Sequence, residues 1–517
     1  MKSIAFYNSR SNTREILIIL SIFSLSWFSL LYFTGSLTSG YHLLDDHEVL
    51  TISQQMKAVG FWKALQYWVI KDFSIRFRPV NYFYLISKIY IFNADFFLMS
   101  LYTALLAVLT STFLYAAARK FRFSIFESVA FTLLTLLGHQ SAIWWRLGPA
   151  ETFGMFFLSI TFYLMSITTR PGKRTLALTL FYIFLVLMSW SKESFIVIIP
   201  ALVYLHLFGK MQKFSLRKLM TRGLPMVAPA LLLLIEVAII LKIGTNQIKY
   251  AGMVSSIDEL LDGLGRIFLN ASVLLHWWQV LFLLVILWIF SSTRDFKKLQ
   301  SRFRIKVAFA TRWFIFALLV VTSNVFLYAK SGMEERYLVP ATMGLAILFV
   351  ALVRSVGSKN IRMLMRVVII GFLSWSFMNA YASVKDFSKW GHETRVLFDS
   401  MKSKAEKNSD ILFVYNGSEL ELIYSLRVYL EHHGYSRIYG HSLKKNFENE
   451  VEAYLNQLVK GQMLEYAFEK NNDIPRNIVF FYPQYVEVFF NSKPGLRKRY
   501  TTALNYEGPI KLFRLKE

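Results

Sequence analysis

Residues 96–118, FFLMSLYTALLAVLTSTFLYAAA, run for 23 positions without a charged side chain. A helix of about 20 mainly apolar residues spans the hydrocarbon core of a bilayer, so this stretch predicts a membrane span. Similar apolar stretches recur as far as Tyr381, and the pattern predicts about eleven spans. They lie near 16–34, 96–118, 125–137, 152–167, 175–188, 195–208, 224–243, 274–290, 307–328, 337–353 and 367–381. The sequence therefore predicts a mostly α-helical, multi-pass integral membrane protein.

The composition agrees with this fold class. The 517 residues are 55% hydrophobic and 17% aromatic, and the mean hydropathy is +0.40, above that of a typical soluble domain. Lys and Arg number 58 against 33 Asp and Glu, so the formal charge is +25, an excess that suits nucleic acid, anionic lipid or phosphate. The chain has no cysteine, which excludes disulfides, thiolate metal ligands and a cysteine nucleophile.

The placement of the basic residues orients the spans. If the amino terminus is cytoplasmic and the loops alternate, six inner segments hold 24 Lys and Arg. The four short outer loops then hold 7, and the long first outer loop holds 6. Cytoplasmic loops are enriched in Lys and Arg, so this asymmetry supports the orientation. Much of the positive charge is thereby explained by topology, and we expect no nucleic-acid partner.

Two parts of the chain lie outside the predicted spans. The first outer loop, about 35–95, carries Trp62, Tyr67 and Trp68 among apolar residues at helical spacing, as an interfacial helix would. The second part, 385–517, follows an odd number of spans and predicts a small extracytoplasmic α/β domain, separate from a transmembrane region at 1–384. Its expected strands are 411–415, 478–482 and 510–515, and its expected helices are 420–431 and 451–469.

Charged and polar residues gather beside the predicted outer ends of the spans. The first outer loop opens with the segment 41–48, YHLLDDHE, which has three acids and two imidazoles. A loop as short as 189–194 needs no ion pair for solubility, so we expect Lys192 and Glu193 to turn into a shared polar cavity at the membrane surface. The candidate residues on this side are Asp45, Asp46, His47, Glu48, Arg78, Arg146, Glu151, Lys192, Glu193, Glu335, Arg336 and Tyr337.

Acids that face several cations suit the transfer of a group from a phosphate. A carboxylate can remove the proton of an acceptor hydroxyl as the new bond forms, while Arg and Lys neutralise the phosphate leaving group. The sequence has no glycine-rich phosphate loop, as expected if the phosphate belongs to a lipid and is bound by side chains.

With an acidic pair, Asp45-Asp46, opening the first outer loop and an external C-terminal domain, the chain resembles the GT-C glycosyltransferases. It is most similar to the protein O-mannosyltransferase and aminoarabinose transferase group. The resemblance covers the membrane region, and it implies a polyprenyl-phosphate-linked sugar donor and inversion at the sugar. It also implies that Asp45 is the general base, that Asp46 is its neighbour, and that Arg78, Arg146, Lys192 and Arg336 bind the donor phosphate. The C-terminal domain matches no external domain of the mannosyltransferases, which leaves the acceptor open.

Each candidate residue also has a plainer structural interpretation. Asp45 or Asp46 would suit a helix cap after the first span. Arg78 would suit a snorkelling interfacial residue, and Arg146 beside Trp144 and Trp145 would suit an aromatic belt. Lys192 and Glu193 could neutralise each other, and the acids before Tyr337 could cap a helix. The functional and the structural interpretation both stay open for these residues at this stage.

A divalent metal, Mg²⁺ or Mn²⁺, is a further alternative. His47 and Glu48 could complete a site with Asp45 and Asp46, because carboxylates and water suit these ions. Adjacent residues on a helix point in different directions, however, so this cluster alone cannot supply a closed ligand set.

The leading hypothesis is a glycosyltransferase that moves a sugar from a polyprenyl-phosphate donor to a hydroxyl of a lipid, glycan or protein. We expect it in a bacterial inner membrane with its active site on the extracytoplasmic side. A transporter or flippase for a glycolipid would also bind a lipid phosphate, although transporters place charges near the bilayer midplane and show inverted repeats. An envelope-polysaccharide polymerase or ligase shares the donor type and is the third hypothesis.

Overall fold

A computed structural model describes most of the chain, and every structural statement below concerns these residues. They are 13–43, 45–73, 78–168, 174–208, 272–296, 300–328, 335–404, 409–416, 420–443, 464–465, 474–480, 482–504 and 511–516, with a few single positions between them.

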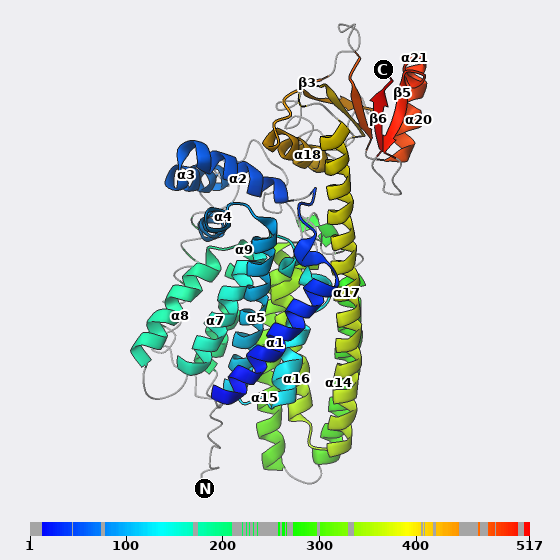
Figure 1. Ribbon diagram of the computed structural model, residues 1–517. Helices are drawn as coiled ribbons and strands as arrows, with labels where there is room; N and C mark the ends of the chain where they lie inside the picture. Colours follow the sequence, from blue (N-terminus) through cyan, green and yellow to red (C-terminus); the bar gives the residue numbers. More distant parts are fainter. Residues whose placement is uncertain are drawn as a thin grey trace. The chain divides into compact units, whose positions relative to one another are not determined.

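The chain divides into two compact units (Figure 1). Unit 1 comprises 1–34, 65–87 and 100–385, and unit 2 comprises 35–64, 88–99 and 386–517. Unit 2 therefore takes segments of the first outer loop together with the C-terminal region. The predicted boundary after residue 384, between a transmembrane region and an external domain, stays a prediction.

Unit 1 is a bundle of helices, and among the described residues six helices are long and apolar enough to cross a membrane. The protein is thus a mostly helical, multi-pass integral membrane protein, as the sequence predicts. The helices of the bundle are α1 (Thr13–Phe33), α5 (Phe96–Lys120), α6 (Ile125–Leu136), α7 (Glu151–Thr168), α8 (Arg174–Ser189), α9 (Glu193–Ile196), α10 (Ile199–Phe208), α14 (Ser272–Phe296), α15 (Gln300–Leu327), α16 (Val339–Ser355) and α17 (Lys359–Lys404).

Close packing of small residues and shared polar contacts hold the bundle together. Helix α16 is buried along nearly its whole length and packs on α15, α6 and α14. At Gly344 a Cβ would come within 3.1 Å of the Val320 side chain, so glycine allows α16 and α15 to approach closely. At the other end of α16, Arg354 Nη1 donates to Glu127 Oε2 at 3.1 Å, and Glu127 also closes a capping box with Ser124 at the start of α6.

The predicted spans agree with these helices where the chain is described. The observed α5 contains the whole of 96–118, and α6 ends one residue before the predicted 137. The predicted span 224–243 lies almost wholly outside the described residues, so the expected number of about eleven spans stays a prediction.

Between α1 and α5 the described residues form a short 3-10 helix, η1 (Ser36–Thr38), and three α-helices, α2 (Asp46–Val59), α3 (Phe61–Phe73) and α4 (Pro79–Phe92). Helix α3 carries Trp62 and Tyr67 with exposed fractions of 73% and 50%, whereas Trp68 is buried. Exposed aromatic side chains are typical of a helix at a membrane interface, and the interfacial role of this helix stays a prediction.

The C-terminal region carries a six-stranded mixed sheet in the order β3-β2-β1-β4-β6-β5. Strands β1 (Ile411–Tyr415), β2 (Ile438–Ser442), β3 (Leu464–Glu465) and β4 (Asn477–Phe480) are parallel, while β6 (Lys511–Leu515) is antiparallel to β4 and to β5 (Tyr500–Leu504). Strands β1 and β4 are buried along their whole length, as expected for strands at the centre of a parallel sheet. The sheet confirms the predicted α/β class.

Helices α18 (Leu420–His432), α20 (Pro483–Ser492) and α21 (Pro494–Arg497) accompany the sheet, and α20 packs on β1 and β4. Within unit 2, α18 also packs against α2. The predicted helix 451–469 is wrong at Leu464–Glu465, which pair with β2 as strand β3, and the rest of that range lies outside the described residues. Pairing at the edge of a sheet can override a local helical pattern in such a short segment.

Candidate active site

One group of predicted site residues meets at a single end of the helix bundle in unit 1. Arg78 directly precedes α4, and Glu193 begins α9 just after α8. The Arg78 guanidinium donates from Nε to Glu193 Oε2 at 2.8 Å and from Nη2 to Glu193 Oε1, so the pair is bidentate. The Arg78 side chain is 11% exposed and that of Glu193 is 32% exposed. The pair therefore lies at the edge of the packed interior.

A second ion pair joins the neighbouring residue to the start of α7. Lys192 Nζ donates to a carboxylate oxygen of Glu151, and the two side chains are only 6% and 1% exposed. The same Nζ lies 4.0 Å from the centroid of the Tyr337 ring. Lys192 and Glu193 thus form their ion pairs with different partners, Glu151 and Arg78, although their charges also act on each other. They cross-link α4, α7 and the segment before α16.

The segment that precedes α16 completes this end of the bundle. Its short helix η5 (Glu335–Leu338) packs against η2 (His139–Trp144), the segment directly before Arg146. The Tyr337 ring stacks on Tyr328 at 4.7 Å, and the Arg336 guanidinium lies 5.4 Å from the Tyr337 centroid. The backbone of Glu335 belongs to η5, but its side chain lies outside the described residues. We call Arg78, Glu151, Lys192, Glu193, Arg336 and Tyr337 the charged cluster.

Electrostatic compensation dominates in the charged cluster. Burial opposes ionisation of Glu193, but the charges of Arg78 and Lys192 outweigh it and hold the pKa of this carboxyl at about 2. Burial lowers the pKa of Lys192, although Glu151 opposes the shift. Glu193 and Glu151 thus compensate the charges of Arg78 and Lys192.

The acidic pair of the first outer loop lies in unit 2, at the start of α2. Asp45 occupies the N-cap position, but its side chain accepts no capping hydrogen bond, so the plain cap interpretation does not hold for it. Asp46 is 3% exposed and accepts from the His42 backbone N–H at 2.9 Å, with His42 Nδ1 at 3.2 Å from the same oxygen. Asp46 is therefore fixed by hydrogen bonds, whereas Asp45 is only half-buried.

The residues that follow the pair are half-buried in the same unit. The His47 ring makes an edge-on contact with Tyr424 of α18 at 4.9 Å, and Glu48 donates its backbone N–H to the Asp45 carbonyl at 3.1 Å. In the described part of the chain no group of three His, Asp or Glu side chains could hold a metal ion. A Mg²⁺ or Mn²⁺ ion bound by only one or two of these carboxylates together with water stays a prediction.

Sequence reasoning missed Lys88 of α4, which also belongs to unit 2. Its side chain is 3% exposed, and burial lowers its pKa to about 7 even though the charge of Asp46 opposes the shift. In the sequence Lys88 is one lysine among apolar residues and resembles an interfacial residue. Only the fold shows that it is a buried cation within the electrostatic range of the acidic pair.

Two solved structures resemble this chain along nearly its whole length. The crystal structure of ArnT from Cupriavidus metallidurans bound to undecaprenyl phosphate covers 97% of this chain and 98% of its own, with a TM-score of 0.51 and 13% sequence identity. The apo state of the same protein has the same coverage, a TM-score of 0.52 and 14% identity. No family model and no curated protein matches the sequence. The chain therefore has an ArnT-like fold.

Proposed function

We propose that this protein is a GT-C glycosyltransferase that moves a sugar from a polyprenyl-phosphate-linked donor to a hydroxyl of an acceptor. The observation that carries the proposal is the likeness of fold over 97% of the chain to a structure that holds undecaprenyl phosphate. Fold alone does not define a function, so the proposal also draws on the charged cluster and on the acidic pair. The distribution of basic loops supports an active site on the extracytoplasmic face, and we place the protein in a bacterial inner membrane.

The donor phosphate is assigned to the cations of unit 1. Glu193 and Glu151 hold Arg78 and Lys192 in place, so the two cationic side chains are already oriented before a ligand binds. We assign Arg336 and Arg146, which lie at the same end of the bundle, to the same phosphate. A phosphate that leaves from a sugar gains negative charge, and preorganised guanidinium and ammonium groups stabilise it.

Asp45 is assigned the role of general base. The acceptor hydroxyl oxygen attacks the anomeric carbon of the sugar, and its proton passes to the Asp45 carboxylate. The bond from the anomeric carbon to the phosphate oxygen breaks, and the electron pair leaves with the polyprenyl phosphate. A single displacement of this kind inverts the configuration at the anomeric carbon. Asp46, held by His42, positions the start of α2 and with it Asp45.

The test is a transfer assay with the variant Asp45→Asn, which keeps the size of the side chain and removes its basicity. We expect the transfer rate to fall by about 10²–10⁴-fold, the usual contribution of a general base. Asp399→Asn, an exposed acid of α17, is the matched control and should keep the parental rate. Full transfer by a correctly folded Asp45→Asn variant would show that the base is assigned wrongly.

A further inference from the structure

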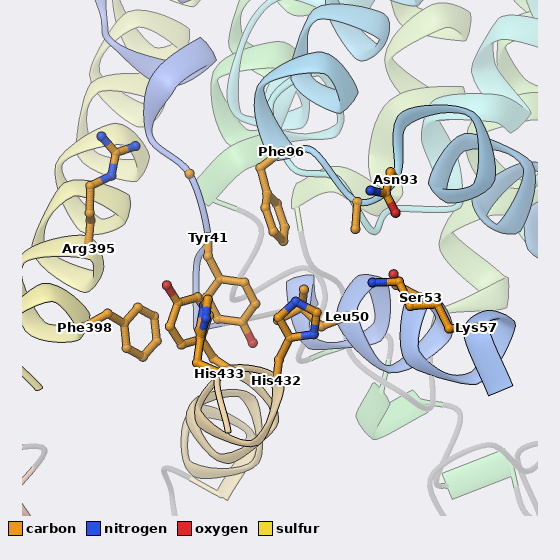
Figure 2. A pocket seen from close by; sticks show the side chains of 13 residues that line it. Tyr41, Leu50, Ser53, Lys57, Asn93, Phe96, Arg395, Phe398, His432 and His433 are labelled. Atoms are coloured by element: carbon orange, nitrogen blue, oxygen red, sulfur yellow. The ribbon is translucent and has the colours of Figure 1, made fainter. Parts of the chain in front are cut away.

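Unit 2 contains a pocket that plays no part in the proposed transfer (Figure 2). Its volume is about 400 Å³, within the range of small-molecule sites. Five segments of unit 2 enclose it, namely the stretch before α2, helix α2 itself, residues 93–96 between α4 and the start of α5, the C-terminal part of α17 and the end of α18. The lining residues are Gly40, Tyr41, Leu50, Ser53, Lys57, Asn93, Ala94, Phe96, Arg395, Phe398, Tyr429, His432 and His433.

The lining of this pocket is basic. Lys57 and Arg395 are exposed and lie on opposite sides of the pocket in Figure 2, with His432 and His433 between them. None of the thirteen lining residues is acidic. Burial and the charge of Lys402 lower the pKa of His433 to about 4, so its ring is a neutral hydrogen-bonding group at pH 7. The local field therefore favours a negatively charged ligand.

The second property of the pocket is that aromatic side chains form one of its walls. The Phe398 and Tyr429 rings stack at 3.5 Å, and the Tyr41 ring lies 4.9 Å from Tyr429 and 5.6 Å from Phe96. The Tyr41 hydroxyl donates to the Ser425 carbonyl at 2.7 Å, which fixes the ring. Flat, rigid aromatic faces of this kind pack well against the C–H face of a sugar ring.

The backbone of the turn that borders the pocket is strained. Asn93 and Ala94 have φ angles of 49° and 57°, in the left-handed region that residues other than glycine rarely occupy. Two such residues in succession are kept only when the surrounding structure requires them, and strain of this kind is frequent beside binding sites. The strained turn places Asn93 at the pocket beside Lys57 (Figure 2).

We propose that this pocket of unit 2 binds an anionic saccharide, a sugar that carries a phosphate or a carboxylate. The ring lies against Tyr41, Phe96 and Tyr429, while the anionic group contacts Lys57. The side chains of His432, Ser53 and Asn93 provide hydrogen bonds to hydroxyl groups. Binding here needs no catalysis, so it can be measured whether or not the transfer proposed above takes place.

The test measures binding of glucose 1-phosphate, glucose and inorganic phosphate to the full-length protein in detergent by calorimetry. We expect glucose 1-phosphate to bind at least about tenfold more tightly than glucose or inorganic phosphate, because the sugar ring and the phosphate group both contribute to its affinity. Lys57→Met should weaken it about fivefold, the upper range for an exposed ion pair. Phe96→Leu should weaken it by a similar factor through the loss of the aromatic face. Lys389→Met is the control, since Lys389 is 75% exposed and does not line the pocket.

Equal binding of glucose 1-phosphate to the parent and to the correctly folded Lys57→Met and Phe96→Leu variants would overturn the proposal. Binding of inorganic phosphate as tight as that of glucose 1-phosphate would also overturn it, because the ring would then contribute nothing. A third arm adds vesicles of phosphatidylglycerol. If they displace glucose 1-phosphate and bind in a Lys57-dependent way more tightly than it does, the pocket belongs to a lipid headgroup and the saccharide assignment is wrong.

Discussion

Two groups of basic side chains in this protein differ in how their charge is balanced. In the charged cluster of unit 1, Arg78 and Lys192 each contact a carboxylate and are largely buried. In the pocket of unit 2, Lys57 and Arg395 are exposed and no acid is among the lining residues. A buried cation without an acid would cost several kcal/mol, so its partner belongs to the fold. An exposed cation carries little such cost and can exchange water for a ligand.

Lys and Arg side chains therefore have different roles in the two regions. The paired cations are held rigidly by the fold, and in the proposed function they contact the donor phosphate. The cations of the pocket form a surface whose charge is completed by a ligand. The following substitutions test this distinction through the stability of the folded protein, from the largest expected effect to the smallest.

The largest effect is expected at the most buried pair. Glu151→Gln removes the carboxylate that the buried Lys192 contacts and should reduce the free energy of unfolding by about 3–5 kcal/mol. The double variant Glu151→Gln/Lys192→Met removes both charges and should recover most of that loss. Thermal unfolding in detergent measures both. A double variant no more stable than Glu151→Gln would show that the pair is not a framework element.

The Arg78–Glu193 pair should give a smaller effect, because Glu193 is 32% exposed and water can replace part of the contact. Glu193→Gln should cost about 1–3 kcal/mol in chemical or thermal unfolding, the range for a hydrogen bond to a charged group. A loss of stability as large as that of Glu151→Gln would show that the extent of burial does not determine how much each ion pair contributes.

Lys88 is an intermediate case, a buried cation that Asp46 compensates only in part. Its pKa is about 7 in the folded protein against 10.5 for an ordinary lysine. Below pH 7 both folded and unfolded states carry the charge, and the folded state bears the full cost of burying it. Between pH 7 and 10.5 the unfolded state binds more protons, so this contribution to stability rises with pH.

Lys88→Met should therefore raise the melting temperature most at pH 6, and the gain should shrink steadily towards pH 10. Lys57→Met, at an exposed lysine of the same unit, should show no such trend. A pH-independent difference at Lys88 would contradict the lowered pKa.

The smallest effect is expected on the surface of α18. Arg427 Nε donates to Glu431 Oε1 at 2.7 Å, one helical turn apart and partly exposed. Arg427→Gln should change the free energy of unfolding by at most about 0.5 kcal/mol. A loss comparable with that of Glu193→Gln would show that the geometry of a pair matters more than its burial.

The described membrane helices and the strands β1, β4 and β6 were predictable because each depends on a local run of apolar residues, whereas β2 and β5 were missed. The uncharged run at 96–118 lies within α5, and the continuous apolar run at 411–415 coincides with β1. Uninterrupted apolar length and buried β-branched or aromatic runs survive almost any tertiary context.

Partners and burial were not predictable, because they depend on contacts between distant residues. Lys192 forms its ion pair with Glu151, which is 41 residues away in the sequence, rather than with the adjacent Glu193. The sequence of the loop does not indicate this partner. The short strand β3 exists only through its pairing with β2. Lys88 and the pocket of unit 2 likewise depend on how the first outer loop packs with the C-terminal region. The assigned roles of Asp45 and of the four cations stay predictions.

The most direct test of the proposed function follows the bond between sugar and phosphate. The purified protein is reconstituted in liposomes that contain a polyprenyl-phosphate-linked sugar, labelled in the sugar, and a membrane extract supplies acceptors at the outer face. Mass spectrometry then measures free polyprenyl phosphate and labelled product. Our account predicts that both form with the parent protein and that both are lost with Asp45→Asn. Movement of the labelled lipid between leaflets with its sugar–phosphate bond intact, and no release of polyprenyl phosphate, would contradict it and indicate a transporter.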